Sequence, residues 1–390
     1  MTVPAIFRIV LLSVLTHTAY KGSKVLMSLS ALELGANEFF VGMIFSTYAL
    51  FPLLLSVYAG KISDRVGFRK PMLFGTIGLF AGLALPFIWQ RLEVLYVAAA
   101  LIGCCYIFYT VSVQHLIGAM AEGMDRTKNY SWFSLGIGMT ALLGPTSAGF
   151  LIDAIGHRAT FGVLAVMPVI PALLLGLWAG WLPRTHQVKV DKEEKAKHRV
   201  GDLLGNPPLR RALITAGIIE TALELYNLLL PIYGHRIGLS ASEIGMILGA
   251  FGFALLIVRS LMPHLVKRSS EEHVLAASLM MATVVCMVFP FVTSFAALFA
   301  ISFVLGAGLG CGSPLSMMLA YNRAPEGRSG EAMGLRQMVN KGTEVLVPFV
   351  FGTLSTALGM VPVFWLDAVL LAVAAALMQR DAKGIKRGGK

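Results

Sequence analysis

The chain of 390 residues is 56% hydrophobic and 14% charged, and its mean hydropathy of +0.75 excludes an ordinary soluble globular protein. A formal net charge of +11 raises the possibility of nucleic-acid binding, but most Lys and Arg fall in alternate loops and chain ends. Only Arg91, Arg158 and Arg236 fall clearly on the opposite side. This bias is typical of a membrane protein with a basic inner face and predicts that both termini are cytoplasmic.

Hydrophobic segments long enough to cross a bilayer recur along the whole chain. A membrane-spanning helix needs roughly 20 apolar residues. The first segment imitates a secretory signal, but it has no convincing cleavage site, its apolar run continues, and eleven more spans follow, so we interpret it as a transmembrane helix. Twelve spans are predicted, near 6–28, 38–59, 71–90, 94–119, 130–152, 160–182, 209–233, 240–262, 272–292, 295–320, 331–356 and 360–379.

The first predicted helix carries three basic residues on one face. His17, Lys21 and Lys24 are spaced by four and three residues. A charge at mid-membrane costs about 3 kcal/mol, so such residues normally face a cavity or a partner. The alternative is that Lys21 and Lys24 extend to the outer surface.

The loop after the second span, GKISDRVGFRK, contains the most specific local motif. Its pattern resembles the signature loop of the major facilitator superfamily. A merely basic inner loop explains the Arg and Lys but not the glycines and the aspartate. In that family the loop acts as a latch between the two halves, and this role is implied for Gly60, Asp64, Arg65, Gly67, Arg69 and Lys70.

The resemblance covers the whole chain because twelve spans and a long central linker accompany the motif. It implies an all-α membrane protein with twelve transmembrane helices in two pseudo-symmetric six-helix bundles. It also implies alternating access and a monomer. The predicted domains are an N-terminal bundle at 1–182, a cytoplasmic linker at 183–208, and a C-terminal bundle with a basic cytoplasmic tail at 209–390.

The fifth span contains Gly144, Pro145 and Gly149, which resemble the GP-containing motif of exporter branches of the superfamily. Small residues permit close helix packing, and proline allows a bend. Thr140 stands where the family usually has Gly. Ordinary Gly- and Pro-rich packing is the alternative, so the motif gives modest support for export.

The sequence repeats itself at a constant shift of 203 residues, which points to a duplicated six-helix unit. The shift also carries His17 onto Glu220, Lys21 onto Glu224 and Lys24 onto Asn227, so a basic stripe becomes an acidic one. The matched pairs are Gly42 and Gly245, Gly103 and Gly306, Pro145 and Pro348, Gly149 and Gly352, Gly156 and Gly359, and Phe161 and Phe364.

The acidic stripe of the seventh span is our candidate for proton coupling. Desolvation favours a neutral carboxyl group, whereas a nearby ammonium favours the anion. Glu220 and Glu224 would therefore load and release a proton if their cation partners changed, unless they cap or pair locally. Other candidate residues for substrate or coupling are Asn227, Tyr226, Arg259, Asn340, Lys341 and Glu344.

Some of these candidates have competing interpretations. Lys341 and Glu344 are one turn apart and can neutralise each other. Arg259 either extends toward the inner surface or receives an anionic substrate group. Arg336 is expected at the inner interface. The four cysteines, which lack metal-ligand spacing, are interpreted as packing residues.

Together these features predict a secondary active transporter in a bacterial cytoplasmic (inner) membrane. Proton-coupled efflux of a small amphipathic compound, such as a drug-like molecule, siderophore or metabolite, is favoured. The alternative is proton-coupled uptake of a small organic anion or zwitterion. An enzyme is not expected because no HExxH or GxSxG occurs. We expect no metal or cofactor and no nucleic acid; the expected partners are the substrate, protons and lipid.

Overall fold

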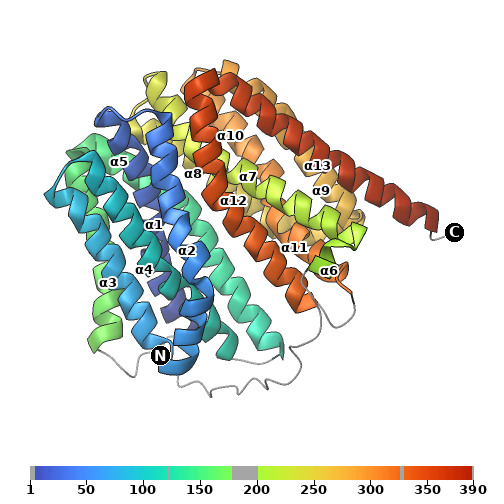
Figure 1. Cartoon of the computed structure of the whole chain (residues 1–390), viewed down its shortest axis with the longest axis horizontal. Coiled ribbons are helices and arrows are strands. Elements are labelled where there is room, and N and C mark those ends of the chain that lie inside the picture. Colours follow the sequence, from blue (N-terminus) through green and yellow to red (C-terminus); the bar gives the residue numbers. More distant parts are fainter. Residues whose placement is uncertain (1–4, 121–122, 178–200, 326–328, 389–390) are drawn as a thin grey trace. The chain divides into compact units, whose positions relative to one another are not determined.

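The computed structural model describes residues 5–120, 123–177, 201–325 and 329–388, and it is built from long helices (Figure 1). It divides into two compact units. Unit 1 comprises Met1–Asp191 with Gly234–Gly249, and unit 2 comprises Lys192–Tyr233 with Ala250–Lys390. Most of the predicted linker lies outside the described residues, and the domain boundaries inferred from the sequence stay a prediction.

Unit 1 is formed mainly by five helices. The first packs along the fifth, and the fourth packs against the second and third. The element α5 contains both the fifth and the sixth predicted spans. These are two helices that meet at Gly156, where the chain turns with a φ of 78°. The helices are α1 (Ala5–Glu33), α2 (Glu38–Val66), α3 (Arg69–Ile88), α4 (Leu92–Ala119) and α5 (Gly123–Leu177).

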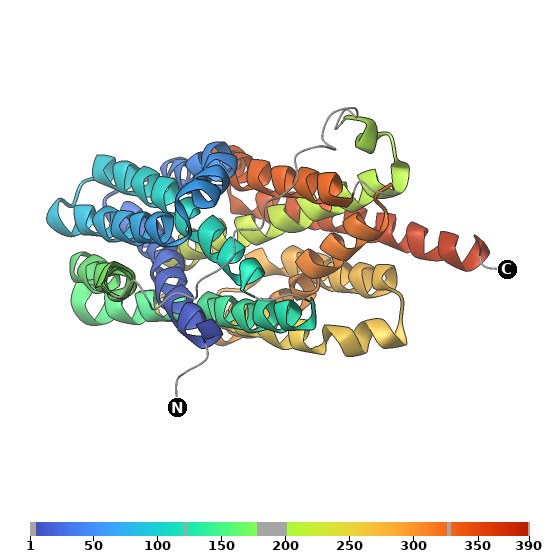
Figure 2. The same cartoon turned by 90° about the horizontal axis from the view of Figure 1, so that it is seen from below.

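Unit 2 holds the remaining helices, apart from the adjoining ends of α7 and α8 that belong to unit 1. The ninth helix packs along the thirteenth (Figure 2). The tenth predicted span is two helices that meet at Cys311. The helices are α6 (Gly201–Leu204), α7 (Pro207–Arg236), α8 (Ala241–Arg268), α9 (Glu271–Val288), η2 (Phe289–Phe291), α10 (Phe295–Gly310), α11 (Gly312–Asn322), α12 (Ser329–Leu358) and α13 (Met360–Gly388).

Nine helical segments of the described residues are long and apolar enough to cross a membrane. One of them, Trp132–Leu177, contains two predicted spans. The twelve spans predicted from the sequence are completed by α1, which carries the basic stripe, and by α12, which carries Arg336, Lys341 and Glu344. The charged residues lower the mean hydropathy of these two helices, because a hydropathy scale does not register whether a charge has a partner.

The 203-residue repeat is visible in backbone contacts inside each unit. A methyl group placed on Gly103 would lie 2.4 Å from the carbonyl oxygen of Tyr48. A methyl group on Gly306 would lie 2.4 Å from that of Phe251, which is Tyr48 shifted by 203 residues. The turn glycines Gly156 and Gly359, also 203 residues apart, likewise share left-handed φ values of 78° and 83°. The two units therefore use one packing scheme.

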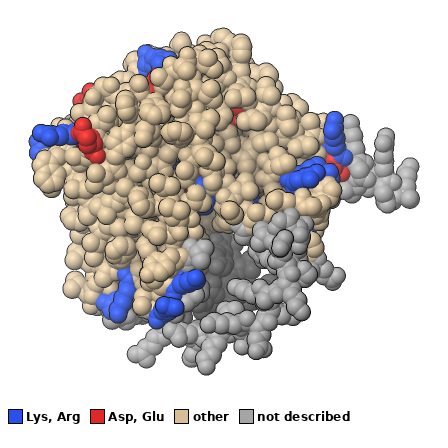
Figure 3. Space-filling model, in the orientation of Figure 1, with Lys and Arg blue, Asp and Glu red and all other residues tan. Residues whose placement is uncertain are grey.

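Apolar side chains cover much of the described surface. In unit 1, Phe80, Val97 and Val166 are exposed, and in unit 2 so are Phe291 and Trp365. On the face in Figure 3, Lys, Arg, Asp and Glu occupy only small groups. A soluble protein rarely exposes so much contiguous apolar area, whereas a lipid-facing surface requires it.

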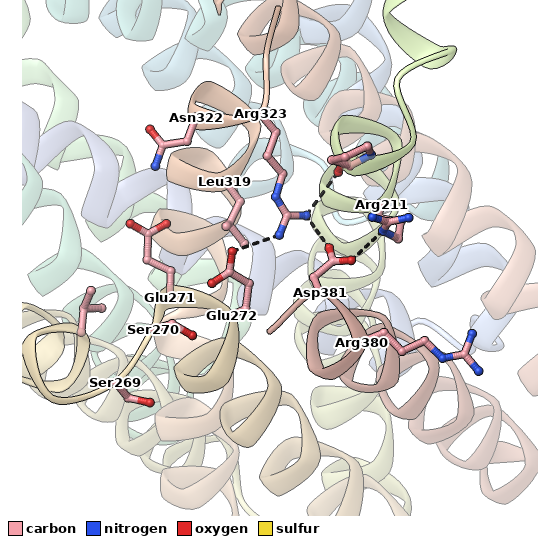
Figure 4. Close-up of a pocket in the computed structure, with 12 residues that line it drawn as sticks. Arg211, Ser269, Ser270, Glu271, Glu272, Leu319, Asn322, Arg323, Arg380 and Asp381 are labelled. Carbon is pink, nitrogen blue, oxygen red and sulfur yellow. Dashed lines mark hydrogen bonds and ion pairs between the residues drawn. The ribbon is translucent and has the colours of Figure 1, made fainter. Parts of the chain in front are cut away.

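A charge network joins four helices of unit 2 beside a cavity of about 810 Å³ (Figure 4). Arg323, which follows α11, donates to Glu272 Oε1 of α9 at 3.1 Å and to Asp381 Oδ2 of α13 at 2.6 Å. Arg211 of α7 lies 2.8 Å from Asp381 Oδ1. These side chains are largely buried, so the network fixes the helix ends relative to one another within the unit. No local sequence pattern indicates this network.

We predict that Arg323→Gln lowers the unfolding temperature of the purified protein by several degrees. Removing the guanidinium leaves Glu272 without that cation in a sheltered site, and breaking a buried pair costs about 3 kcal/mol. The control is Arg380→Gln, because Arg380 borders the same cavity but is exposed. Equal shifts of the two variants in thermal unfolding would contradict a specific role for Arg323.

Candidate functional site

His17 lies in an aromatic pocket of unit 1. Its side chain is only 5% exposed, and its Nδ1 lies 2.8 Å from the carbonyl oxygen of Ser13. Because a carbonyl oxygen only accepts hydrogen bonds, Nδ1 is the nitrogen that carries the hydrogen. The rings of Tyr106, Tyr109 and Phe133 meet the imidazole edge-on, with centroids 5.3 to 6.3 Å away. His17 is thus held in one orientation by packing.

Lys24 lies next to a second group of aromatic rings. Its Nζ is 5.5 Å from the ring centroid of Phe45 and 5.9 Å from that of Tyr20. These separations permit cation–π attraction, which partly replaces lost hydration. Tyr20 also stacks on Tyr106 with centroids 3.7 Å apart. Tyr20 and Tyr106 were not singled out from the sequence, although Tyr20 lies between Lys21 and His17 in the basic stripe.

The predicted bend motif forms helix contacts of unit 1. A methyl group on Gly144 would lie 2.6 Å from Lys21 Cβ and 2.9 Å from the backbone nitrogen of Gly22. A methyl group on Gly149 would lie 2.2 Å from the carbonyl oxygen of Ala241. Pro145 lies within α5 between these two points. The glycines therefore let α1 and the start of α8 approach α5, and Lys21 sits at the first crossing.

The signature loop joins α2 and α3 within unit 1. Gly60 lies inside α2, and Gly67 ends that helix with a φ of 78°. Arg69 donates from Nε to the carbonyl oxygen of Leu175 at 2.5 Å, and from Nη2 to that of Gly176 at 2.6 Å. It therefore satisfies carbonyls at the end of α5.

The other charged residues of the loop contribute differently. Arg65 and Lys70 are exposed, and the side chain of Asp64 lies outside the described part of the structure. The latch between halves implied by the resemblance stays a prediction, because the contacts of Arg69 lie within unit 1.

A polar seam within unit 1 fixes the start of α8. Asp153 of α5 accepts from the backbone nitrogen of Ala241 at 3.1 Å and from that of Ser242 at 2.7 Å. A carboxylate at a helix start satisfies free N–H groups and complements the helix dipole. Glu38 of α2 also pairs with Arg236 of α7. No local sequence pattern indicates this seam, since its partners are far apart in the chain.

The acidic stripe of α7 divides into packing residues and ionisable ones. Asn227 Nδ2 donates to the carbonyl oxygen of Leu223 on its own helix at 2.8 Å. Tyr226 is buried and stacks on Phe251 with centroids 4.2 Å apart. Glu224 is buried and Glu220 half-buried, so these two carboxyl groups are the chemically versatile members of the stripe.

Glu220 is surrounded by ionisable groups of unit 2. Lys341 and Arg336 attract its carboxylate, whereas Glu224 and Glu344 repel it. Lys341 and Glu344 form an ion pair on α12, as their spacing suggested. Both charge signs therefore meet around one carboxyl group.

Arg336, which we expected at the inner interface, is buried inside the protein. It is 5% exposed, and its Nη2 donates to the carbonyl oxygen and the hydroxyl of Ser313 at 3.0 and 3.2 Å and to Ser316 Oγ at 3.2 Å. Arg259 of α8 donates from Nε to the carbonyl oxygen of Gly310 at 3.4 Å. Both arginines thus reach the junction of α10 and α11, which no local sequence signal revealed.

One further intramembrane carboxyl group was missed. Asp367 of α13 is 3% exposed, and the thiol of Cys286 lies 3.7 Å from its Oδ2. Its spacing matches no stripe, so only the packing of α9 on α13 brings the pair together. Among the described residues, His, Cys, Asp and Glu form no group of three or more that suits a metal ion.

Comparison with known proteins identifies the relatives of this chain. The family model described as Major Facilitator Superfamily matches residues 9–340 and 212–387. A multidrug resistance protein MdtG of Klebsiella pneumoniae (strain 342) is 27% identical over 338 residues, which cover 84% of this chain and 80% of that protein. The MdtG protein of Dickeya zeae is 25% identical over 342 residues, covering 85% and 82%.

Solved structures share the fold at lower identity. A peptide transporter POT in complex with sulfate has a TM-score of 0.77 at 16% identity, and the match covers 98% of this chain and 95% of that one. A POT family transporter in complex with 5-aminolevulinic acid has a TM-score of 0.78 at 14% identity, covering 97% and 96%. At such identities the likeness concerns the fold alone.

We predict that Gly144→Ala impairs folding, because even a methyl group there collides with Lys21 Cβ and the Gly22 backbone. The matched control is Gly176→Ala near the end of α5, where an added methyl group meets nothing within 4 Å. The measurement is the monodisperse yield and unfolding temperature in detergent. Normal behaviour of Gly144→Ala would show that α1 and α5 do not depend on this contact.

We predict that Asp153→Asn speeds backbone hydrogen–deuterium exchange at residues 241–249 several-fold, because the cap loses its charge and one acceptor oxygen. The control is Glu93→Gln, an exposed acidic residue in the first turn of α4. Exchange at 241–249 that is unchanged in Asp153→Asn would rule out the carboxylate as the group that fixes α8.

Proposed function

The chain belongs to the major facilitator superfamily, and we propose that it exports small amphipathic organic compounds in exchange for protons. It is a multi-pass membrane protein and a secondary transporter of small molecules, not an enzyme. The direction of transport, the coupling ion and the class of compound are the proposed parts. Export is supported by the MdtG relatives, whose name denotes multidrug resistance.

The observation that carries proton coupling is the cluster around Glu220. A carboxyl group in a membrane span is costly as an anion unless a cation is near. Here Lys341 and Arg336 supply attraction, while Glu224 and Glu344 oppose it. A modest rearrangement of these neighbours changes the balance between the charged and neutral forms. Glu220 is therefore suited to take up a proton in one state and release it in another.

Transport would proceed by alternating access of a single chain in the inner membrane of a bacterium, with both termini in the cytoplasm. The basic loops support this orientation, since Lys and Arg are retained inside. In this orientation the seam of Asp153 and α8 faces outward.

Uptake of a small organic anion or zwitterion is the second candidate. It is favoured by the partly buried cations Lys21, Lys24 and Arg259, which suit a negatively charged substrate. The two candidates differ in the direction in which the solute moves under one proton gradient. Antiport drives the solute against the proton flow, and symport drives it with the flow.

We predict that Glu220→Gln and Glu224→Gln lower proton-driven export by tenfold or more, because an amide cannot load a proton. The measurement is dye accumulation in everted membrane vesicles after a pH gradient is imposed, with ethidium as the probe. Glu93→Gln serves as the exposed control.

The same assay contains the outcomes that would refute the proposal. If both glutamine variants retain wild-type gradient-driven transport, these residues are not the coupling groups. If the wild-type protein moves solute in the direction of the proton flow, export by antiport is wrong and uptake replaces it.

A further inference from the structure

The junction of α10 and α11 contains a backbone acceptor that the helix cannot satisfy. Pro314 has no N–H, so it cannot make the hydrogen bond to the carbonyl oxygen of Gly310 four residues earlier. Arg259 donates to this oxygen instead, from Nε at 3.4 Å. The proline thus leaves this carbonyl oxygen to a guanidinium from α8 in the interior of unit 2, beside the buried Gly310 and Gly312.

A second guanidinium reaches the same junction from α12. Arg336 uses one terminal nitrogen for all its hydrogen bonds to Ser313 and Ser316. Its Nε is buried and has no hydrogen-bond partner within the described chain. Asn340, one turn further along α12, is 6% exposed and its Oδ1 also lacks a partner there. Buried polar groups in proteins rarely lack a hydrogen-bond partner.

Glu220 does not complete the pairing of the two arginines. It exerts an electrostatic effect on both Arg259 and Arg336. Among the ion pairs of the described residues, however, none joins Glu220 to either arginine within 4.0 Å. The terminal nitrogens of Arg259 likewise have no acceptor in the described part of unit 2. Donor capacity for an oxyanion therefore remains at this junction.

We propose that Arg259 and Arg336, at the junction of α10 and α11, bind an oxyanionic group of the transported solute, such as a carboxylate, phosphonate or sulfonate. Two planar guanidiniums supply paired N–H donors that match such groups. The hydroxyls of Ser313 and Ser316 and the amide of Asn340 orient the ligand. The proposal rests on the chain being a transporter, but it requires neither export nor proton coupling.

The test measures equilibrium binding to the full-length protein in detergent by isothermal titration calorimetry. The probes share one ring system and differ in charge: 2-naphthoate, neutral 2-naphthamide and cationic 2-naphthylmethylammonium. Partition into micelles is corrected by titrating the same detergent without protein. No proton gradient is present, so the result is independent of the ethidium assay.

The expected result is that 2-naphthoate binds at least tenfold more tightly than the other two probes. Arg259→Gln and Arg336→Gln should each weaken naphthoate binding about tenfold or more and leave naphthamide binding unchanged. Arg259→Lys, which keeps the charge but loses the planar fork, should show a smaller loss. Arg380→Gln is the control and should bind like the wild type.

If Arg336→Gln does not fold, the two Arg259 variants carry the test, because the one hydrogen bond of Arg259 to the described residues is long, at 3.4 Å. Equal binding of the three probes, no binding of 2-naphthoate to the wild type, or unchanged binding in both Arg259 variants would overturn the inference. Failure here with gradient-driven ethidium transport intact would leave the proposed function standing. Naphthoate binding that depends on the arginines, without gradient-driven ethidium transport, would support the oxyanion site and contradict proton-driven export.

Discussion

The high cost of an unpartnered charge away from water organises the interior of this protein. Each unit meets this constraint from its own residues. In unit 1, Lys24 lies against aromatic rings, and Arg69 binds helix-end carbonyls. In unit 2, Arg323 joins two carboxylates, and Lys341 joins Glu344. Ion pairs and contacts at helix ends thus stabilise each unit separately, as rigid-body movement during transport requires.

Some charged groups meet this constraint only in part, and these are the candidates for binding a ligand or a proton. Glu220 has attracting and repelling neighbours, and Arg259 makes a single long hydrogen bond. Such groups change state at small energetic cost, in contrast to the closed network around Arg323. Unit 2 therefore contains two charged regions: the network around Arg323, whose charges are paired, and the surroundings of Glu220 and Arg259, where the pairing is incomplete.

The sequence predicted the scaffold well because its signals are local or periodic. Hydrophobic length located the spans, and the 203-residue register located the turn glycine Gly156 and the contact glycines Gly103 and Gly306. Arg336, Asp153 and Arg323 escaped because their partners are distant in sequence and a hydropathy pattern does not encode distance. Asn227 and Tyr226 shared a helical face with Glu220, but periodicity cannot tell a packing residue from a reactive one. The break between α10 and α11 at Cys311 was not predicted. Pro314 removes a helix hydrogen bond, but the sequence does not reveal that Arg259 binds the freed carbonyl oxygen.

The equal contacts of Gly103 and Gly306 also bear on how this chain is able to diversify. At both positions a neighbouring carbonyl oxygen occupies the space that any side chain would need, so the backbone contact admits only glycine. The ionisable stripes, in contrast, differ between the two repeats in the sign of charge. The two repeats have therefore kept these helix crossings while their charged positions diverged.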